Sequence, residues 1–142
     1  MLAALLATIV AALFAGAAIY VNVAEQPARL ALTDGPMLAQ WQASYPRAAS
    51  MQASLAIIGG VLAIIAYFLL SDWRWLLAAI LILANWPYTL VCIKPTNDAL
   101  KGIQASSAGA EARRLVERWG TLHAGRSALG AAATIVGIWA LQ

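Results

Sequence analysis

The sequence has little charge and almost no cysteine, and both shortages exclude classes of protein. Only 11% of the 142 residues are charged and 63% are hydrophobic, whereas soluble domains are about 25% charged. This balance predicts an integral membrane protein. The lone Cys92 excludes an intrachain disulfide, a CxxC redox pair and a thiolate metal cluster, and the absence of a CxxCH motif excludes covalent c-type haem.

Basic residues are scarce as well. The net charge is only +3, and no basic run resembles a nucleic-acid footprint, so we expect no nucleic-acid partner. The first 24 residues carry no charged side chain, whereas a signal peptide begins with a basic region. We therefore expect an uncleaved first helix.

Long uncharged runs mark the expected membrane helices. Three of them are long enough to cross a bilayer, which takes about 20 residues, and the fourth is long enough only if it starts near His123. Lipid admits only helices or closed barrels. The sequence thus predicts an all-α integral membrane four-helix bundle as a single domain over residues 1–142, with helices at about 2–24, 48–71, 74–93 and 110–141.

The connections between these helices differ in length and charge. A tight hairpin is expected at 71–74, whereas the two longer connections, 25–47 and 94–126, fall on the same side of an even-numbered bundle. They contain eight lysines and arginines, and the opposite side contains only Arg74. The positive-inside rule therefore predicts a multi-pass protein of the bacterial inner membrane, with both termini non-cytoplasmic.

The only histidine opens the last apolar segment. Trp119, His123 and Arg126 follow one another at i, i+4 and i+7, so they share one helix face. An ionisable residue at the membrane boundary is by default a candidate functional residue. Apolar surroundings and nearby cations favour the neutral form of histidine, which suits a general base. The alternative is a hydrogen-bonded packing histidine.

Polar residues also close the first helix. Asn22 and Glu25 are three residues apart and therefore share a face at the end that leads into a long connection. One interpretation makes them an ordinary interfacial helix end. The other places Glu25 half buried in a pair with a cation such as Arg126 or Lys94.

The third helix contains a proline. Pro87 removes one helical hydrogen bond and kinks the helix, and Asn85 and Tyr88 lie on one side of that kink. Asn85 either satisfies the backbone groups that the proline frees or lines a cavity that the kink opens. Metal binding is not expected, because one histidine with few carboxylates falls short of the usual ligand sets. A non-covalent haem on a single axial histidine stays open.

Five short blocks, in fixed order, carry a resemblance to a known family. They are Asn22…Glu25-Gln-Pro-Ala-Arg29, Trp41…Tyr45…Arg47, Asn85-Trp-Pro-Tyr-Thr89, Lys94-Pro-Thr-Asn97 and Arg118-Trp119…Leu122-His123…Arg126. With these blocks the chain resembles the anthrone oxygenase-like family of small four-helix membrane proteins, which in bacteria is a domain of unknown function. The resemblance implies a monooxygenase that oxidises an anthrone to an anthraquinone with O₂ and no evident cofactor.

The resemblance also suggests roles for individual residues. An anthrone is flat, apolar and acidic at its central CH₂, so its oxidation needs a base, cations and aromatic walls. His123 is the expected base, and Arg126 and Lys94 are the expected stabilising cations. The expected substrate-binding residues are Asn22, Glu25, Arg47, Asn85, Trp86, Tyr88, Asn97 and Trp119. We expect the polar members of this set to converge on one pocket.

Two other functions stay open at this stage. One is a non-catalytic membrane protein whose polar cluster fixes helix register or binds a lipid or quinone. The other is a haem- or quinone-linked redox protein. In each case the expected partner is a hydrophobic small molecule or lipid, and a homo-oligomer is a further option.

Overall fold

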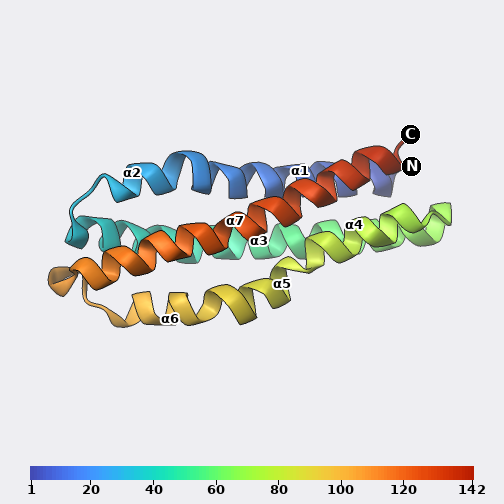
Figure 1. Cartoon of the computed structure of the whole chain (residues 1–142). Coiled ribbons are helices and arrows are strands. Elements are labelled where there is room, and N and C mark those ends of the chain that lie inside the picture. The colour runs from blue at the N-terminus through green and yellow to red at the C-terminus, as the bar shows by residue number, and fades with distance from the viewer.

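Helices account for 91% of the chain in the computed structural model, which describes all residues 1–142. No strand is present, and the predicted all-α bundle is confirmed. The elements are α1 (Leu2–Tyr20), η1 (Val21–Glu25), α2 (Gln26–Leu30), α3 (Asp34–Leu70), α4 (Trp73–Leu83), α5 (Asn85–Tyr88), η2 (Thr89–Ile93), α6 (Lys94–Gly102), η3 (Ala105–Ser107) and α7 (Ala110–Ala140). Consecutive elements join into four long rods (Figure 1).

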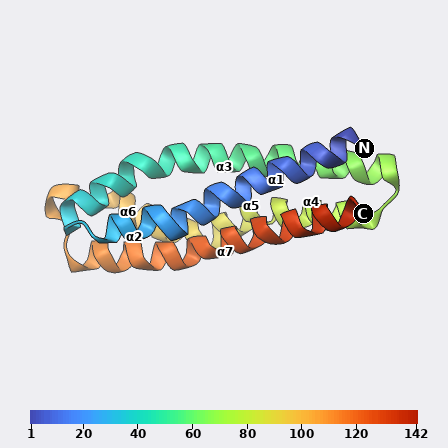
Figure 2. The ribbon, with the colours of Figure 1, turned by 90° about the horizontal axis from the view of Figure 1, so that it is seen from above.

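The four rods lie side by side and alternate in direction (Figures 1 and 2). The first rod comprises α1, η1 and α2, and the third comprises α4, α5, η2 and α6. Each of these two rods packs against both α3 and α7. Both termini and the α3–α4 turn lie at one end of the bundle, which we call the terminal end. The α2–α3 and α6–α7 connections lie at the opposite end, the loop end.

Three of the rods are long and apolar enough to cross a membrane. They are Leu2–Leu30, Asp34–Leu70 and Trp73–Gly102. Many of their large hydrophobic side chains are exposed on the outside of the bundle, as expected where lipid is the solvent. α7 is also long enough, at 31 residues, but its first half carries several charges. The chain is therefore a membrane protein, with three rods that are long and apolar enough to span the bilayer.

Small residues allow the first rod and α7 to approach closely. A Cβ added to Gly130 would lie 2.6 Å from Cδ1 of Phe14, and one added to Gly137 would lie 2.9 Å from Oγ1 of Thr8. The buried face of α1 is otherwise formed largely by alanines: Ala4, Ala7, Ala11, Ala15 and Ala18. Helices in lipid associate through such close van der Waals packing, since burial from water does not drive them together.

The helices extend further into the expected connections than predicted. α3 begins at Asp34 rather than near residue 48, because Pro36 falls in its first turn, where no N–H is needed, and Asp34 suits the positive end of the helix. An ion pair of 2.6 Å between Asp34 and Arg113 of α7 fixes this start. Similarly, the third rod continues to Gly102 rather than ending at 93.

Two π-helical turns let the rods continue past prolines. Val21–Glu25 and Thr89–Ile93 are each followed, after one further residue, by a proline: Pro27 and Pro95. A proline ring crowds the carbonyl four residues earlier and offers it no N–H. In both rods that carbonyl lies inside the π-helical turn, whose wider loop gives it room. Such turns are frequent at functional sites, and the first one carries Asn22.

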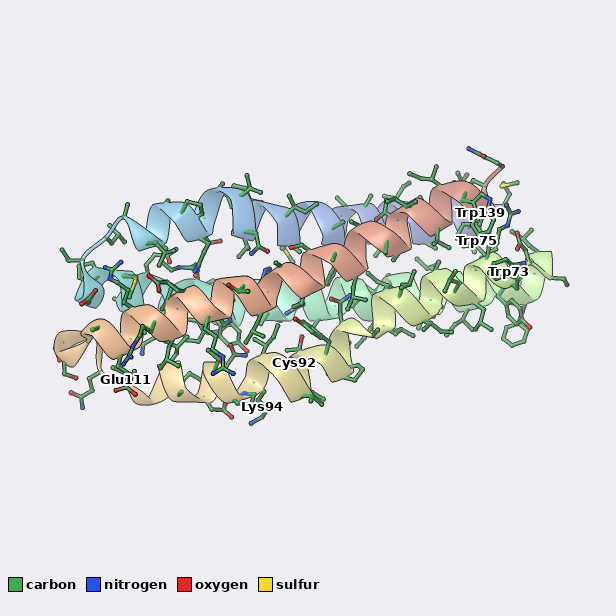
Figure 3. The ribbon with its side chains drawn as sticks, viewed as in Figure 1. Trp73, Trp75, Cys92, Lys94, Glu111 and Trp139 are labelled. Atoms are coloured by element: carbon green, nitrogen blue, oxygen red, sulfur yellow. The ribbon has the colours of Figure 1, made fainter.

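Aromatic residues mark the terminal end. The rings of Trp73 and Trp139 are 5.6 Å apart in an edge-on arrangement, and both side chains are exposed (Figure 3). This position suits the aromatic belt of a membrane interface. Beside them, Asp72 accepts a hydrogen bond from the backbone N–H of Arg74 and so caps α4. Hydrogen bonds from the Arg74 side chain hold the pKa of Asp72 below its usual value.

Candidate functional site

His123 and Asn22 meet in the loop-end half of the bundle. The imidazole is only 3% exposed, and its Nδ1 lies 2.9 Å from Oδ1 of Asn22. The other end of the amide is fixed, because Nδ2 of Asn22 donates to the carbonyl of Gly120 at 2.8 Å. The oxygen facing His123 is therefore an acceptor, and it also accepts from Oγ of Ser127 at 2.8 Å. Nδ1 of His123 must carry the proton, which leaves the lone pair on Nε2.

An aromatic face fixes the plane of the imidazole. His123 stacks on Trp119, with ring centroids 4.9 Å apart and an interplanar angle of 29°. Nε1 of Trp119 donates to Oδ1 of Asn97 at 2.9 Å, and Nδ2 of Asn97 donates to Oη of Tyr45 at 2.8 Å. Tyr45 in turn stacks on Trp41. Asn97 thus orients Trp119 and lines neither of the pockets described below.

One of the two buried arginines, Arg29, donates hydrogen bonds to several side-chain acceptors. Arg29 is buried, and its guanidinium carbon lies 5.4 Å from the ring centroid of Trp119. Its Nη2 pairs with Oε1 of Glu25 at 2.5 Å. Its further acceptors are Gln26, Gln40 and Ser44. Of the two interpretations of Glu25, the structure shows the half-buried carboxylate paired with a cation, and that cation is Arg29, one helical turn away on the same rod, instead of Arg126 or Lys94. The charges of this pair balance.

The second buried arginine has no such partner. Arg126 is 7% exposed, forms no salt bridge, and its Nε lacks any hydrogen-bond acceptor. The guanidinium carbon of Arg126 lies 5.5 Å from the ring centroid of Phe14, a cation–π contact. Burying an unpaired cation is costly, so the guanidinium is poised to receive a negatively charged or strongly polar oxygen.

Two pockets border Arg126, where the sequence predicted one. The first, which we call the histidine pocket, measures about 10 Å³ and is lined by Val21, Glu25, Arg29, Ser44, Tyr45, Ala48, Ala49, Gln52, Trp119, His123 and Arg126. The second, the side pocket, measures about 110 Å³ and is lined by Ala49, Ala53, Ala56, Asn85, Trp86, Thr89, Leu90 and Arg126. Arg126 and Ala49 form the wall that both pockets share.

Asn85 lines a cavity at the kink, which is the second of the two interpretations that the sequence left open. Its Nδ2 donates to the carbonyl of Ile82 at 3.0 Å and so satisfies a backbone group beside the Pro87 kink. Its Oδ1 is buried and unpaired, and the residue lines the side pocket. The same is true of Oγ1 of Thr89. The kink and the cavity are thus parts of one arrangement.

Tyr88 links two rods and lines neither pocket. Its hydroxyl donates to the carbonyl of Leu122 at 2.7 Å. Tyr88 can come this close to α7 only because residue 125 is glycine, since a Cβ at that position would overlap the Tyr88 ring and hydroxyl. Tyr88 therefore fixes the third rod against α7 close to His123 instead of forming a wall for substrate.

Two predicted site cations lie outside both pockets, and their placement in the site is wrong. The Lys94 side chain is 56% exposed on the outer edge of α6 and pairs with Asp98 at 2.5 Å, one turn along the same helix (Figure 3). Arg47 is exposed on α3 and donates to the carbonyl of Ala43 at 3.2 Å. Both long side chains reach water and local partners at little cost, so neither is drawn inward.

Sequence reasoning missed several residues that line the histidine pocket, among them Arg29, Tyr45 and Gln52. Gln52 is buried with its Oε1 unpaired, and a lone amide inside an apolar run was a signal for it. Arg29 and Tyr45 stood in the blocks that carried the family resemblance, yet nothing in their spacing pointed to His123. Their positions depend on how the rods pack.

The arrangement offers a base, a cation and aromatic faces. A lone pair is available at Nε2 of His123, and the free guanidinium of Arg126 lines the same pocket. No group of three or more histidine, cysteine, aspartate or glutamate side chains lies close enough together to hold a metal ion. The donors on these walls are thus amides, hydroxyls, guanidiniums and one imidazole.

Comparison with known proteins identifies the family of this chain. The family model described as anthrone oxygenase matches residues 41–136, more than half of the chain. The chain belongs to the anthrone oxygenase family. The match includes His123 and Arg126, whereas Asn22 and Glu25 precede it.

A curated relative supports the same assignment. This family member is 36% identical over 66 residues to the protein named anthrone oxygenase tpcL of Aspergillus fumigatus. That match covers 44% of this chain and 41% of the relative's own length. No solved structure matches the chain.

Proposed function

We propose that this anthrone oxygenase family member is a membrane-embedded monooxygenase. It oxidises the acidic CH₂ of an anthrone, or of a related flat aromatic, to a carbonyl with O₂ and without a bound cofactor. His123 is the base. The observation that carries the proposal is the Asn22 amide, which leaves Nε2 of His123 unprotonated in a pocket that also holds the unpaired Arg126.

The chemistry balances with O₂ as the only oxidant. Nε2 of His123 removes a proton from the CH₂, and the resulting carbanion is delocalised into the ring carbonyl. The carbanion donates electrons to O₂, and a C–O bond forms to give a substrate hydroperoxide after protonation. Loss of the second C–H proton with cleavage of the O–O bond yields the carbonyl, and the other oxygen atom leaves as water.

Arg126 supplies the electrostatic part of this reaction. Negative charge develops first on the substrate oxygen and then on the reduced O₂. A preorganised cation in a water-poor site stabilises such charge more strongly than it would in water. The histidine pocket, at about 10 Å³, has room for one water-sized molecule. The aromatic body of the substrate would therefore lie in the side pocket, and its CH₂ edge would have to pass Arg126 and Ala49, the wall that both pockets share, to reach Nε2 of His123.

The proposal includes a fourth membrane passage by α7. This helix has 31 residues and packs against both α1 and α4. Its charged first half lies toward the loop end, and its apolar second half reaches the terminal end (Figure 2). His123 would then sit just inside the membrane boundary.

The test is O₂ consumption by purified protein in detergent with emodin anthrone, measured against the spontaneous rate. Loss of a general base costs about 10²–10⁴ in rate, so we expect His123→Ala to lose the acceleration by that factor. The matched control is Lys94→Ala, which removes an exposed cation outside both pockets and should leave the rate unchanged. A wild-type protein that accelerates no member of a panel of anthrones would overturn the enzyme proposal.

A non-catalytic carrier of a quinone or lipid is the second candidate. The side pocket favours it, because exposed Trp86 and Leu90 border a largely apolar cavity in a rod that is long and apolar enough to span a membrane. Such a carrier would bind a quinone without consuming O₂. A redox protein would instead be purified with a bound chromophore.

A further inference from the structure

The side pocket opens through the outer wall of the bundle. Trp86 and Leu90 line it and are 42% and 55% exposed. Both residues belong to the rod Trp73–Gly102, which is apolar and long enough to span a membrane. The solvent at the opening is therefore lipid rather than water.

A kink and a row of small residues together create this opening. The third rod changes direction between α4 and α5, and α5 and α6 run away from the line of α4 (Figure 1). On the facing side, α3 presents only alanines: Ala49, Ala53 and Ala56, which follow one another at i, i+4 and i+7. No side chain on α3 is large enough to fill the space that the kink leaves.

The inner wall of the pocket is polar and incompletely paired. Oδ1 of Asn85, which is 2% exposed, has no donor, and Nε of Arg126 has no acceptor. Oγ1 of Thr89 is unpaired as well. Buried polar atoms in proteins are nearly always hydrogen-bonded. Three unpaired atoms around one cavity point to a ligand that carries both a donor and an acceptor.

We propose that the side pocket is a lateral entrance and binding site for a flat, lipid-soluble aromatic that carries hydroxyl and carbonyl oxygens. The ligand enters from the bilayer between α3 and α5. Its hydroxyl donates to Asn85, its carbonyl or ionised oxygen accepts from Arg126, and its rings lie against the alanines and Trp86. This inference rests on the proposed function, since Arg126 is also a wall of the histidine pocket.

Binding of a hydroxylated anthraquinone to the protein in lipid vesicles tests the entrance. The probe cannot react further by the proposed chemistry, and its binding is measured by quenching of tryptophan fluorescence. Ala53→Phe places a ring inside the side pocket without touching the histidine pocket, and should weaken binding by about tenfold or more, which is 1.4 kcal/mol. Ile58→Phe places the same ring on an exposed face of α3 that Ala53 does not share and should leave binding unchanged.

Cysteine labelling gives a second measurement that does not depend on a bulky substitution. In a Cys92→Ser background, which removes the only native thiol, Ala53→Cys should react with a lipid-soluble thiosulfonate, and the anthraquinone should protect it. Ile58→Cys, on an exposed face of α3 that Ala53 does not share, should react without protection. An Ala53→Cys thiol that the probe does not protect, or wild-type protein that does not bind the probe, would overturn the entrance.

The two proposals fail in different ways. Probe binding that is lost in Ala53→Phe, in a protein that oxidises no anthrone, would retain the pocket and remove the enzyme. Anthrone oxidation that depends on His123 but is unchanged, together with binding, in Ala53→Phe would retain the enzyme and remove the lateral entrance.

Discussion

The Asn22 amide has different partners at its two ends, and this difference decides which ring nitrogen of His123 carries the proton. Its nitrogen faces the carbonyl of Gly120, which can only accept, so its oxygen faces the imidazole. Asn22 is thus a positioning residue that acts through His123. The assignment has a spectroscopic signature, because the chain contains only one histidine.

Replacing Asn22 with leucine should remove the preference of His123 for the tautomer protonated at Nδ1. With ¹⁵N-labelled histidine, the wild-type spectrum should show one neutral imidazole protonated at Nδ1. Asn22→Leu removes the acceptor, so we expect a mixture of tautomers together with a loss of anthrone oxidation. A variant that is folded and inactive but keeps the Nδ1-protonated spectrum would contradict a positioning role.

Arg126 differs from Arg29 in having its hydrogen-bonding positions free. A guanidinium can grip oxygen through a planar fork, whereas an ammonium acts as a point charge. We expect Arg126→Lys to lower kcat by about tenfold, equivalent to 1.4 kcal/mol of transition-state stabilisation, and Arg126→Met to lower it further. Steady-state kinetics of the three proteins measure this. Equal rates for arginine and lysine would mean that charge alone matters.

At the scale of the helices, the contact between Tyr88 and Gly125 holds the kinked rod against α7. A methyl group at Gly125 would overlap the tyrosine ring, and overpacking of this kind costs about 1–3 kcal/mol. We expect Gly125→Ala to lower the thermal stability of the protein in detergent. Gly16→Ala is the matched control, since nothing lies within 4 Å of a Cβ there, and its stability should be unchanged or higher. Equal stability of both variants would show that the contact is not tight.

The helices could be predicted from apolar runs, but their ends could not. The prolines at 36, 46 and 95 lie in the stretches predicted as connections, yet Pro36 falls in a first turn, Pro46 lies inside α3 and Pro95 follows a π-helical turn. A proline ends a helix only where its ring meets a carbonyl that cannot move. That condition depends on neighbouring rods and is invisible in a single sequence.

In the site, too, some features follow from the sequence of one helix and others only from the packing of several helices. The shared face of Trp119, His123 and Arg126 follows from helical spacing, and all three side chains are buried as expected. Their partners come from other rods: Asn97 for Trp119 and Asn22 for His123. The pairing of Glu25 with Arg29 is local, one helical turn along the same rod, whereas the packing of the helices decides that Arg126 receives no carboxylate.

At the scale of the whole molecule, both termini lie at the end opposite the two charged connections (Figure 1). The eight-to-one distribution of lysine and arginine then predicts a loop end in the cytoplasm. A reporter active only in the cytoplasm, fused after Gln142, should give no signal. A reporter active outside the cytoplasm should give one, and the reverse pattern would invert the orientation.

The π-helical turn at Val21–Glu25 has a consequence for the comparison of relatives. A turn widened in this way holds one more residue than an α-helical turn, and each residue advances the helix by about 100°. A relative one residue shorter here would rotate Asn22 away from His123 while keeping every downstream motif. The family match begins at residue 41, after this turn. Membership in the family therefore does not show which face of the first helix points toward His123. The number of residues before Pro27 decides whether a relative keeps an amide in the position of Asn22.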